Sequence, residues 1–248
     1  MIRTIASHEW RVLARSPFAW IAAGLLQLVF GWLFLSAVEQ FANNQAIIAQ
    51  RADSAGLSAY LVVHWLAPAS IVFLLATPLI CMQLIAGEHQ SGRFALLASA
   101  PVTAFEIVAG KFIGATVFQY LILLFNAVLA SVLLLTARLD LLHLLSAYLG
   151  LALFIAAATA VSMTFSAFTH RPVLAAFSSF CALLMLWLLA DSAATERSLQ
   201  LISPAAHMNS FMRGVIDSRD VVFFLTFTAV WLLLCCWRVD KSRHIAGH

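Results

Sequence analysis

Six apolar stretches, each close to the length that crosses a membrane, constrain this chain more than any other feature of its sequence. A helix needs roughly 20 apolar residues to cross about 30 Å of hydrocarbon. Hydrophobic residues make up 63% of the 248 residues and charged residues only 10%, against roughly 25% charged in a typical soluble domain. We therefore predict an all-α polytopic membrane protein with one transmembrane domain. The predicted transmembrane helices cover residues 18–38, 65–87, 112–137, 141–168, 172–190 and 221–237.

The first 17 residues are predicted to form an amphipathic helix that lies along the membrane surface. Apolar and basic side chains alternate there, as Ile2, Ile5, Trp10, Arg11 and Arg15 illustrate. A simple basic flank before the first span is the alternative. A cleaved signal peptide is not expected, because the apolar run that follows is too long for one and lacks a clear cleavage site.

The basic residues predict that both termini face the cytoplasm. In that arrangement nine of the 14 Lys and Arg residues fall on the cytoplasmic side and five on the outer side, as the positive-inside rule requires. The formal net charge of +3 then reflects membrane orientation, and no nucleic-acid partner is expected.

The predicted spans carry no recognisable catalytic or metal-binding pattern. Their centres contain no Asp, Glu, Lys or Arg, which argues against a proton-coupled carrier or a charge-lined channel. Residues 87–93 imitate the glycine spacing of a phosphate-binding loop, but Arg93 and Phe94 stand where such a loop needs Lys followed by Ser or Thr. The cysteines, and the close glycines Gly110 and Gly114, are interpreted as packing residues. We therefore expect no catalytic residue, metal site or cofactor in this chain.

A polar segment between the second and third predicted spans is the leading candidate for a functional contact. Residues 88–93 read Glu-His-Gln-Ser-Gly-Arg, and an amphipathic segment follows. We predict a short helix at 94–100 whose apolar side chains dock in a groove of a soluble partner. Pro101 would end that helix, and Glu88 is expected to pair with Arg93 or with a basic residue of the partner. An interfacial loop with no partner is the alternative.

The last outer segment, residues 191–220, is the second candidate site. It is expected to line an exit gate or to receive an accessory periplasmic protein through His207, Phe211, Arg213, Asp217 and Asp220. The structural alternative is that Arg213 and Arg219 pair with Asp217 and Asp220 to order the turn into the last span.

Three stretches resemble one family of membrane proteins. The first resembles the first cytoplasmic loop of ABC-2 type exporter permeases, through Glu88-x-x-x-Gly92, Leu96-Leu97, Ala100-Pro101-Val102, Glu106 and Gly110-Lys111. The family pattern has Gly-Thr-x-Glu where this chain has Gly92-Arg93-Phe94-Ala95. Residues 15–20 resemble the start of the family's first span. Residues 203–220 are similar to the last outer segment of the gliding-motility-type branch.

This resemblance implies the transmembrane subunit of an ATP-driven exporter in a bacterial inner membrane. It implies a twelve-span dimer, with an identical or paralogous permease, that rests on two copies of a separate ATPase subunit, which bind ATP and Mg. The residues implied in coupling to that ATPase are Glu88, Gly92, Arg93, Phe94, Leu96, Leu97, Pro101, Glu106 and Lys111. Two rival predictions remain open: a membrane scaffold or assembly component of a gliding-type complex, and a copper or anion maturation permease, suggested by His207, Met208 and Met212. The sequence does not identify the substrate.

Overall fold

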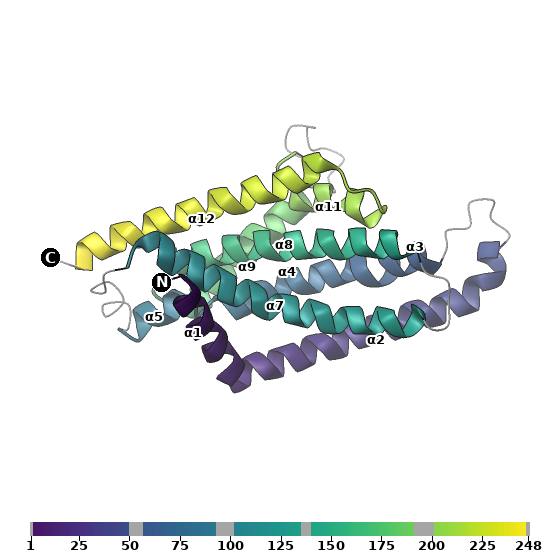
Figure 1. The fold of residues 1–248 in the computed structure, drawn as a ribbon, viewed down its shortest axis with the longest axis horizontal. Coiled ribbons are helices and arrows are strands. Elements are labelled where there is room, and N and C mark those ends of the chain that lie inside the picture. The colour runs from purple at the N-terminus through teal and green to yellow at the C-terminus, as the bar shows by residue number, and fades with distance from the viewer. Residues whose placement is uncertain (1, 50–56, 93–101, 135–139, 191–200, 247–248) are drawn as a thin grey trace.

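The computed structural model describes residues 2–49, 57–92, 102–134, 140–190 and 201–246, and within these ranges the chain forms helices joined by turns (Figure 1). The elements are α1 (Ile2–Arg15), α2 (Pro17–Ala49), α3 (Leu57–Leu61), the π-helix η1 (Val62–Leu66), α4 (Ala67–Cys81), α5 (Ala86–Gln90), α7 (Ala104–Leu134), α8 (Leu141–Phe168), α9 (Pro172–Leu188), α11 (Pro204–Met212) and α12 (Ser218–Ala246).

Five helical segments within the described ranges are long and apolar enough to cross a membrane. They are Pro17–Asn44, Ser58–Gln90, Ala104–Ser131, Leu141–Phe168 and Ser218–Ser242. The shorter apolar helix α9 runs beside them and contacts α4 and α8. The prediction of an all-α polytopic membrane protein is thus confirmed.

The helices α4 and α8 form the centre of the bundle, and α2 and α12 form its outer surface. In the most apolar window of Ser58–Gln90 and of α8, 67% of the residues are buried, against 28% in α2 and 17% in α12. Aromatic side chains fill the contact between α2 and the second span: Trp65 is fully buried and donates a hydrogen bond from Nε1 to the carbonyl of Phe30 (3.2 Å). The apolar faces of α2 and α12 are therefore the most exposed and are available to lipid.

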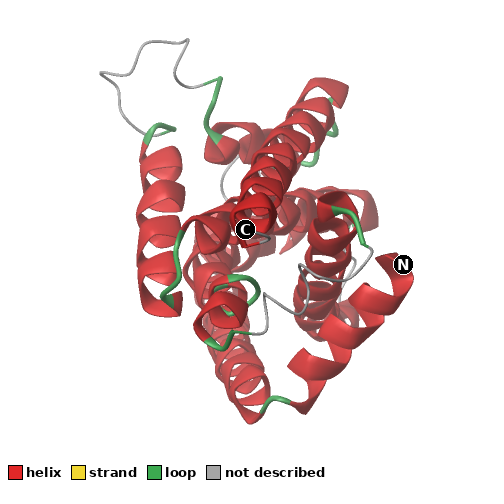
Figure 2. Ribbon diagram, turned by 90° about the vertical axis from the view of Figure 1, so that its left-hand side faces the viewer, coloured by secondary structure: helices red, strands yellow, loops and turns green. Residues whose placement is uncertain are grey.

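The amphipathic helix α1 lies across one end of the bundle rather than along it (Figures 1 and 2). We call this the N-terminal end. It also holds α5 and the last turns of α12, whereas α3 lies at the opposite, distal end, toward which α11 also lies (Figure 1). A sharp corner joins α1 to α2, because Pro17 cannot continue the hydrogen bonding of α1. Trp20 Nε1 donates to the carbonyl of Ala14 (2.6 Å) across this corner.

The second span is broken, although the sequence predicted one helix at 65–87. Pro68 lacks a backbone N–H, and just before it the N–H of Ala67 donates to the carbonyl of Val62, five residues back, as in a π-helix. A second break lies between α4 and α5. There Ser166 of α8 accepts hydrogen bonds from the N–H groups of Ile85 (3.3 Å) and Ala86 (3.0 Å). Because lipid offers no hydrogen bonds to free backbone groups, this serine makes the second break possible.

Candidate functional site

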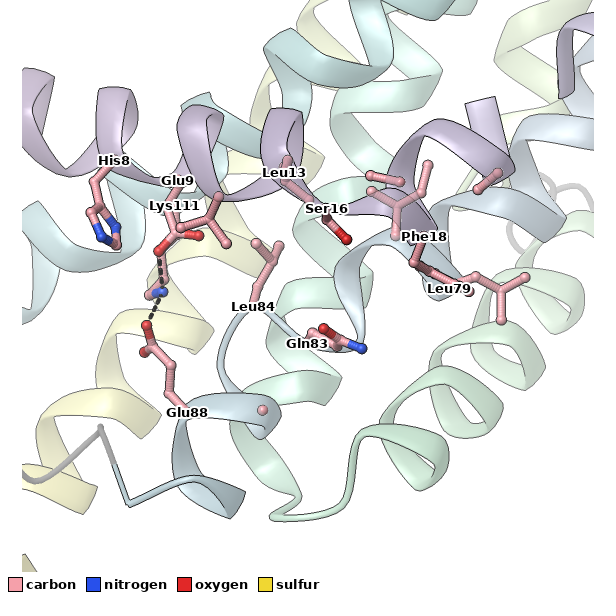
Figure 3. Close-up of a pocket in the computed structure, with 15 residues that line it drawn as sticks. His8, Glu9, Leu13, Ser16, Phe18, Leu79, Gln83, Leu84, Glu88 and Lys111 are labelled. Atoms are coloured by element: carbon pink, nitrogen blue, oxygen red, sulfur yellow. Dashed lines mark hydrogen bonds and ion pairs between the residues drawn. The ribbon is translucent and has the colours of Figure 1, made fainter. Parts of the chain in front are cut away.

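A buried lysine joins three elements at the N-terminal end. Lys111 lies in the second turn of α7, and its side chain is 1% exposed. Its Nζ donates to Glu9 Oε1 of α1 (2.5 Å) and to Glu88 Oε1 of α5 (2.6 Å) (Figure 3). We call these three residues the ion cluster. Separating such a pair leaves a buried charge without compensation, which costs several kcal/mol, so the cluster holds α1, α5 and α7 together.

Two glycines of α7 allow α1 to come close enough for this contact. A Cβ added to Gly110 would lie 2.7 Å from Ile5 Cβ, and one added to Gly114 would lie 2.7 Å from Glu9 Cβ. Real carbon atoms do not approach so closely, so any larger residue at either position would push α1 away from α7. The glycine pair therefore sets the helix separation at which the carboxylate of Glu9 reaches Lys111.

Glu106 has a local role at the start of α7. Its Oε2 accepts a hydrogen bond from the backbone N–H of Thr103 (3.0 Å), while Thr103 Oγ1 accepts from the N–H of Glu106 (3.2 Å). This reciprocal arrangement is a capping box, which satisfies backbone donors that the first turn of a helix leaves free. The sequence predicted Glu106 as a coupling residue, and the contacts seen here are those of a helix cap.

The predicted coupling segment is described only at its two ends. At the first end, Gly92 follows the C-terminus of α5 with φ +70° and donates its N–H to the carbonyl of His89 (3.3 Å), so it terminates that short helix in a conformation that favours glycine. Glu88 pairs with Lys111, and its predicted pairing with Arg93 or with a basic residue of the partner stays a prediction. The predicted helix at 94–100 and the residues Arg93, Phe94, Leu96, Leu97 and Pro101 lie outside the described residues.

Glu9 was missed as a site residue in the sequence. It is separated by 102 residues from Lys111, so no local spacing connects them. One signal was available: Glu9 falls on the same stripe of α1 as Ile2, Ile5 and Leu13, at the spacing of an apolar helix face. An acid on an apolar stripe indicates a buried partner, and Lys111 is that partner.

At the distal end, His207 and Asp220 join α11 to α12. His207 Nδ1 lies 2.6 Å from Asp220 Oδ1, and His207 Nε2 lies 3.0 Å from the carbonyl oxygen of Leu201. The imidazole also stacks on Phe223, with ring centroids 3.9 Å apart. Asp217 Oδ1 accepts from the backbone N–H of Arg219 (2.9 Å) and caps α12. The arginine–aspartate pairing considered for this segment is therefore replaced by a histidine–aspartate contact.

The helix α11 packs closely against α8. Phe211 is fully buried, and a Cβ added to Gly150 would lie 2.6 Å from Phe211 Cβ. Ser146 Oγ donates to the carbonyl of Phe211 (3.1 Å). Gly214 ends α11 with φ +79°, and Arg213 before it is exposed. Of the five residues predicted for this segment, Phe211, His207 and Asp220 meet other elements, whereas Arg213 and Asp217 lie on the surface.

A comparison with known protein families determines the class of the protein. The family described as ABC-2 family transporter protein matches residues 3–242. The chain belongs to the ABC-2 transporter family. None of the curated proteins compared with this ABC-2 chain matches it. Because the family match covers nearly the whole chain, the protein is a multi-pass permease component of an ABC transporter and not itself a catalytic domain. Permeases of this family generally act with an ABC ATPase.

In the part of the chain that the structure describes, this ABC-2 permease has no group of three His, Cys, Asp or Glu residues that is arranged to hold a metal ion. Met208 and Met212 line a distal cavity of about 340 Å³ between η1, α4, α9 and α11, and His207 does not. The imidazole of His207 is instead engaged by Asp220. The contacts of His207 are thus explained by the joint between α11 and α12.

Proposed function

We propose that this permease is the transmembrane subunit of an ATP-driven exporter, and that its N-terminal end receives a separate ATPase on the cytoplasmic side of a bacterial inner membrane. In this proposal a second permease, identical or paralogous, and two ATPase subunits complete the transporter. The excess of Lys and Arg on the side of the termini supports this orientation. An accessory periplasmic protein would meet the distal end, at the surface of α11.

The observation that carries the proposal is the ion cluster. The predicted docking segment at 94–100 leaves α5 and leads into α7, and Lys111 joins these two helices to each other and to α1. A push on the docking segment would therefore move α5, α7 and α1 together instead of bending the connection between them. Rigid-body movement of this kind is a common way in which closure of one domain is transmitted to another.

The break between α4 and α5 would act as the joint for this movement. Its backbone is held by the hydroxyl of Ser166 and by a turn hydrogen bond from the N–H of Leu84 to the carbonyl of Cys81. Because the helix is not continuous there, α5 can tilt at a smaller cost than in an unbroken span. The core helices α4 and α8 are mostly buried and would provide the fixed frame.

The proposal is tested by measuring ATP turnover of the ATPase subunit, purified from the same host, with and without the permease in lipid nanodiscs. Intact permease should raise the turnover. The double variant Phe94→Asp/Leu97→Asp should abolish the increase, because it places charge on the predicted apolar anchors. The matched control, Val215→Asp/Ile216→Asp, changes two exposed apolar residues on the distal side (59% and 56% exposed) and should keep it.

Two results would contradict this function. If no ATPase co-purifies with the permease and none is stimulated by it, the chain is a scaffold rather than a transporter subunit. If the Phe94→Asp/Leu97→Asp variant stimulates as well as the intact chain, the docking contact lies elsewhere.

A further inference from the structure

A cavity of about 170 Å³ lies beside the ion cluster, between α1, the start of α2, the end of α4 and α5 (Figure 3). Cavities of about 150 Å³ admit a guest the size of benzene, whereas sites for drug-sized ligands measure about 300–1,000 Å³. This cavity therefore suits one small chemical group rather than a whole large molecule.

One end of the cavity is polar and carries excess negative charge. Glu9 and Glu88 line it together with Lys111 and His8, so two carboxylates share one ammonium. Glu88 Oε2 is buried and, among the described residues, has no hydrogen-bond partner. An unpaired buried carboxylate oxygen is unfavourable. A guest with a positive charge in the cavity would balance the second carboxylate of the ion cluster.

The other end of the cavity is apolar and reaches the surface that faces lipid. Leu13 and Leu84 line its middle, and Phe18 and Leu79 lie at the end away from the ion cluster (Figure 3). Phe18 and Leu79 are each 50% exposed, as apolar side chains are where they contact acyl chains. A molecule that fits both ends has a small cationic head and an apolar body.

We propose that this cavity binds the primary ammonium headgroup of a membrane lipid, drawn from the leaflet in which α1 lies. The ammonium lies beside the carboxylates that line the polar end and balances the second negative charge of the ion cluster. The glycerol and acyl chains leave past Phe18 and Leu79 into the bilayer. The phosphate, which joins the ammonium to the glycerol, lies between these two ends, where Ser16 and Gln83 line the cavity.

The chemistry of the polar end distinguishes this guest from other candidates. An anion such as free phosphate would meet two carboxylates and is disfavoured. A quaternary ammonium such as choline is positively charged, but it carries three methyl groups on its nitrogen, so it is larger and has no N–H to donate to a carboxylate. The cavity should therefore prefer phosphatidylethanolamine to phosphatidylcholine, two lipids that differ in the headgroup alone.

The test is native mass spectrometry of the full chain in detergent micelles, with phosphatidylethanolamine or phosphatidylcholine of matched acyl chains added at equal concentration. The wild-type chain should retain phosphatidylethanolamine about tenfold better, as expected for one charge-assisted hydrogen bond. Glu88→Gln should remove this preference by neutralising the acceptor. Ala22→Phe should remove it independently by filling the cavity without touching the ion cluster. Glu39→Gln, an exposed carboxylate on α2, is the matched control and should retain it.

Equal retention of the two lipids by the wild-type chain would overturn the proposal, as would an undiminished preference in both Glu88→Gln and Ala22→Phe. The bound amine could belong to a membrane lipid or to a soluble amine, and competition with free ethanolamine distinguishes these two sources. If millimolar ethanolamine displaces all bound lipid, the site serves a soluble amine and the lipid assignment is wrong. No ATPase is present in this measurement, so its outcome does not depend on the proposed coupling function.

Discussion

Replacing Lys111 with methionine tests how strongly the ion cluster holds α1, α5 and α7 together. Each N–O contact, at 2.5 and 2.6 Å, is worth roughly 6 kcal/mol of gross attraction at an effective dielectric constant of about 20. Loss of hydration offsets most of that gain, and removing one partner of a buried pair costs about 3–5 kcal/mol net. Because Glu88 is 22% exposed, water relieves part of the cost, and we expect about 3–4 kcal/mol.

The assay is thermal unfolding of the purified protein in detergent micelles. For a chain of this size a loss of 1 kcal/mol lowers the melting temperature by about 2–4 °C, so Lys111→Met should lower it by roughly 6–16 °C. The triple variant Glu9→Gln/Lys111→Met/Glu88→Gln removes the stranded charges and should recover most of the loss. The control Lys241→Met changes an exposed lysine whose ammonium lies 5.4 Å from the Trp237 ring and should cost no more than about 1 kcal/mol.

Either of two results would contradict this role of the ion cluster. A melting temperature for Lys111→Met within 2 °C of wild type, on the order of a 1 kcal/mol change, would mean that the cluster contributes little. A triple variant no more stable than Lys111→Met would mean that the cost comes from lost packing and not from uncompensated charge.

Three further predictions use the same unfolding assay. Ser166→Ala should cost about 1–3 kcal/mol, because it leaves buried backbone N–H groups unpaired. The control Ser131→Ala changes an exposed site and should cost little. Equal costs would contradict the role given to Ser166. Gly150→Val should cost about 1–3 kcal/mol by overpacking, since even a Cβ there would lie 2.6 Å from a side-chain carbon of α11. The control Gly24→Val should be close to neutral, because a Cβ at Gly24 would have nothing within 4 Å. If the control is equally destabilising, the packing explanation is wrong. His207→Ala should cost about 1–2 kcal/mol by removing the contact between α11 and α12; an unchanged melting temperature would show that this joint is not structural.

The membrane-spanning helices could be predicted from apolar length, but their ends could not. The first span was predicted at 18–38, whereas α2 continues to Ala49. Glu39, Gln40 and Asn44 end the apolar run without ending the helix, since polar residues are tolerated in a helix that leaves the hydrocarbon. The hydropathy of the sequence indicates where a helix leaves the hydrocarbon of the membrane. It does not indicate where the helix itself ends, which depends on the backbone conformation.

The breaks in the second span depend on contacts that a local pattern does not contain. Pro68 marked a possible irregularity near the start of that span. The break between α4 and α5 contains no proline. It is made possible by the hydroxyl of Ser166, which lies 80 to 84 residues away in the sequence. A prediction made one segment at a time therefore merged α4 and α5 into one span.

The contacts of the candidate site could be predicted from the sequence only where the residues involved are close together in the chain. Thr103-x-x-Glu106 has the spacing of a capping box, and it forms one. The ion cluster depends instead on how α1 packs on α7, which brings Glu9 to a lysine 102 residues away. The distal contact depends on where α12 begins: a start at Ser218 buries Asp220 beside His207 and leaves Arg219 exposed.

Cross-linking from one side of the membrane tests whether the N-terminal end of this ABC-2 permease meets a cytoplasmic ATPase. A single cysteine at position 97, in a chain whose four native cysteines are replaced, is exposed in intact membrane vesicles to a cross-linker added on one side at a time. We expect reaction from the cytoplasmic side and an adduct with the ATPase subunit whose yield changes when ATP is added. Reaction from the periplasmic side alone would contradict it.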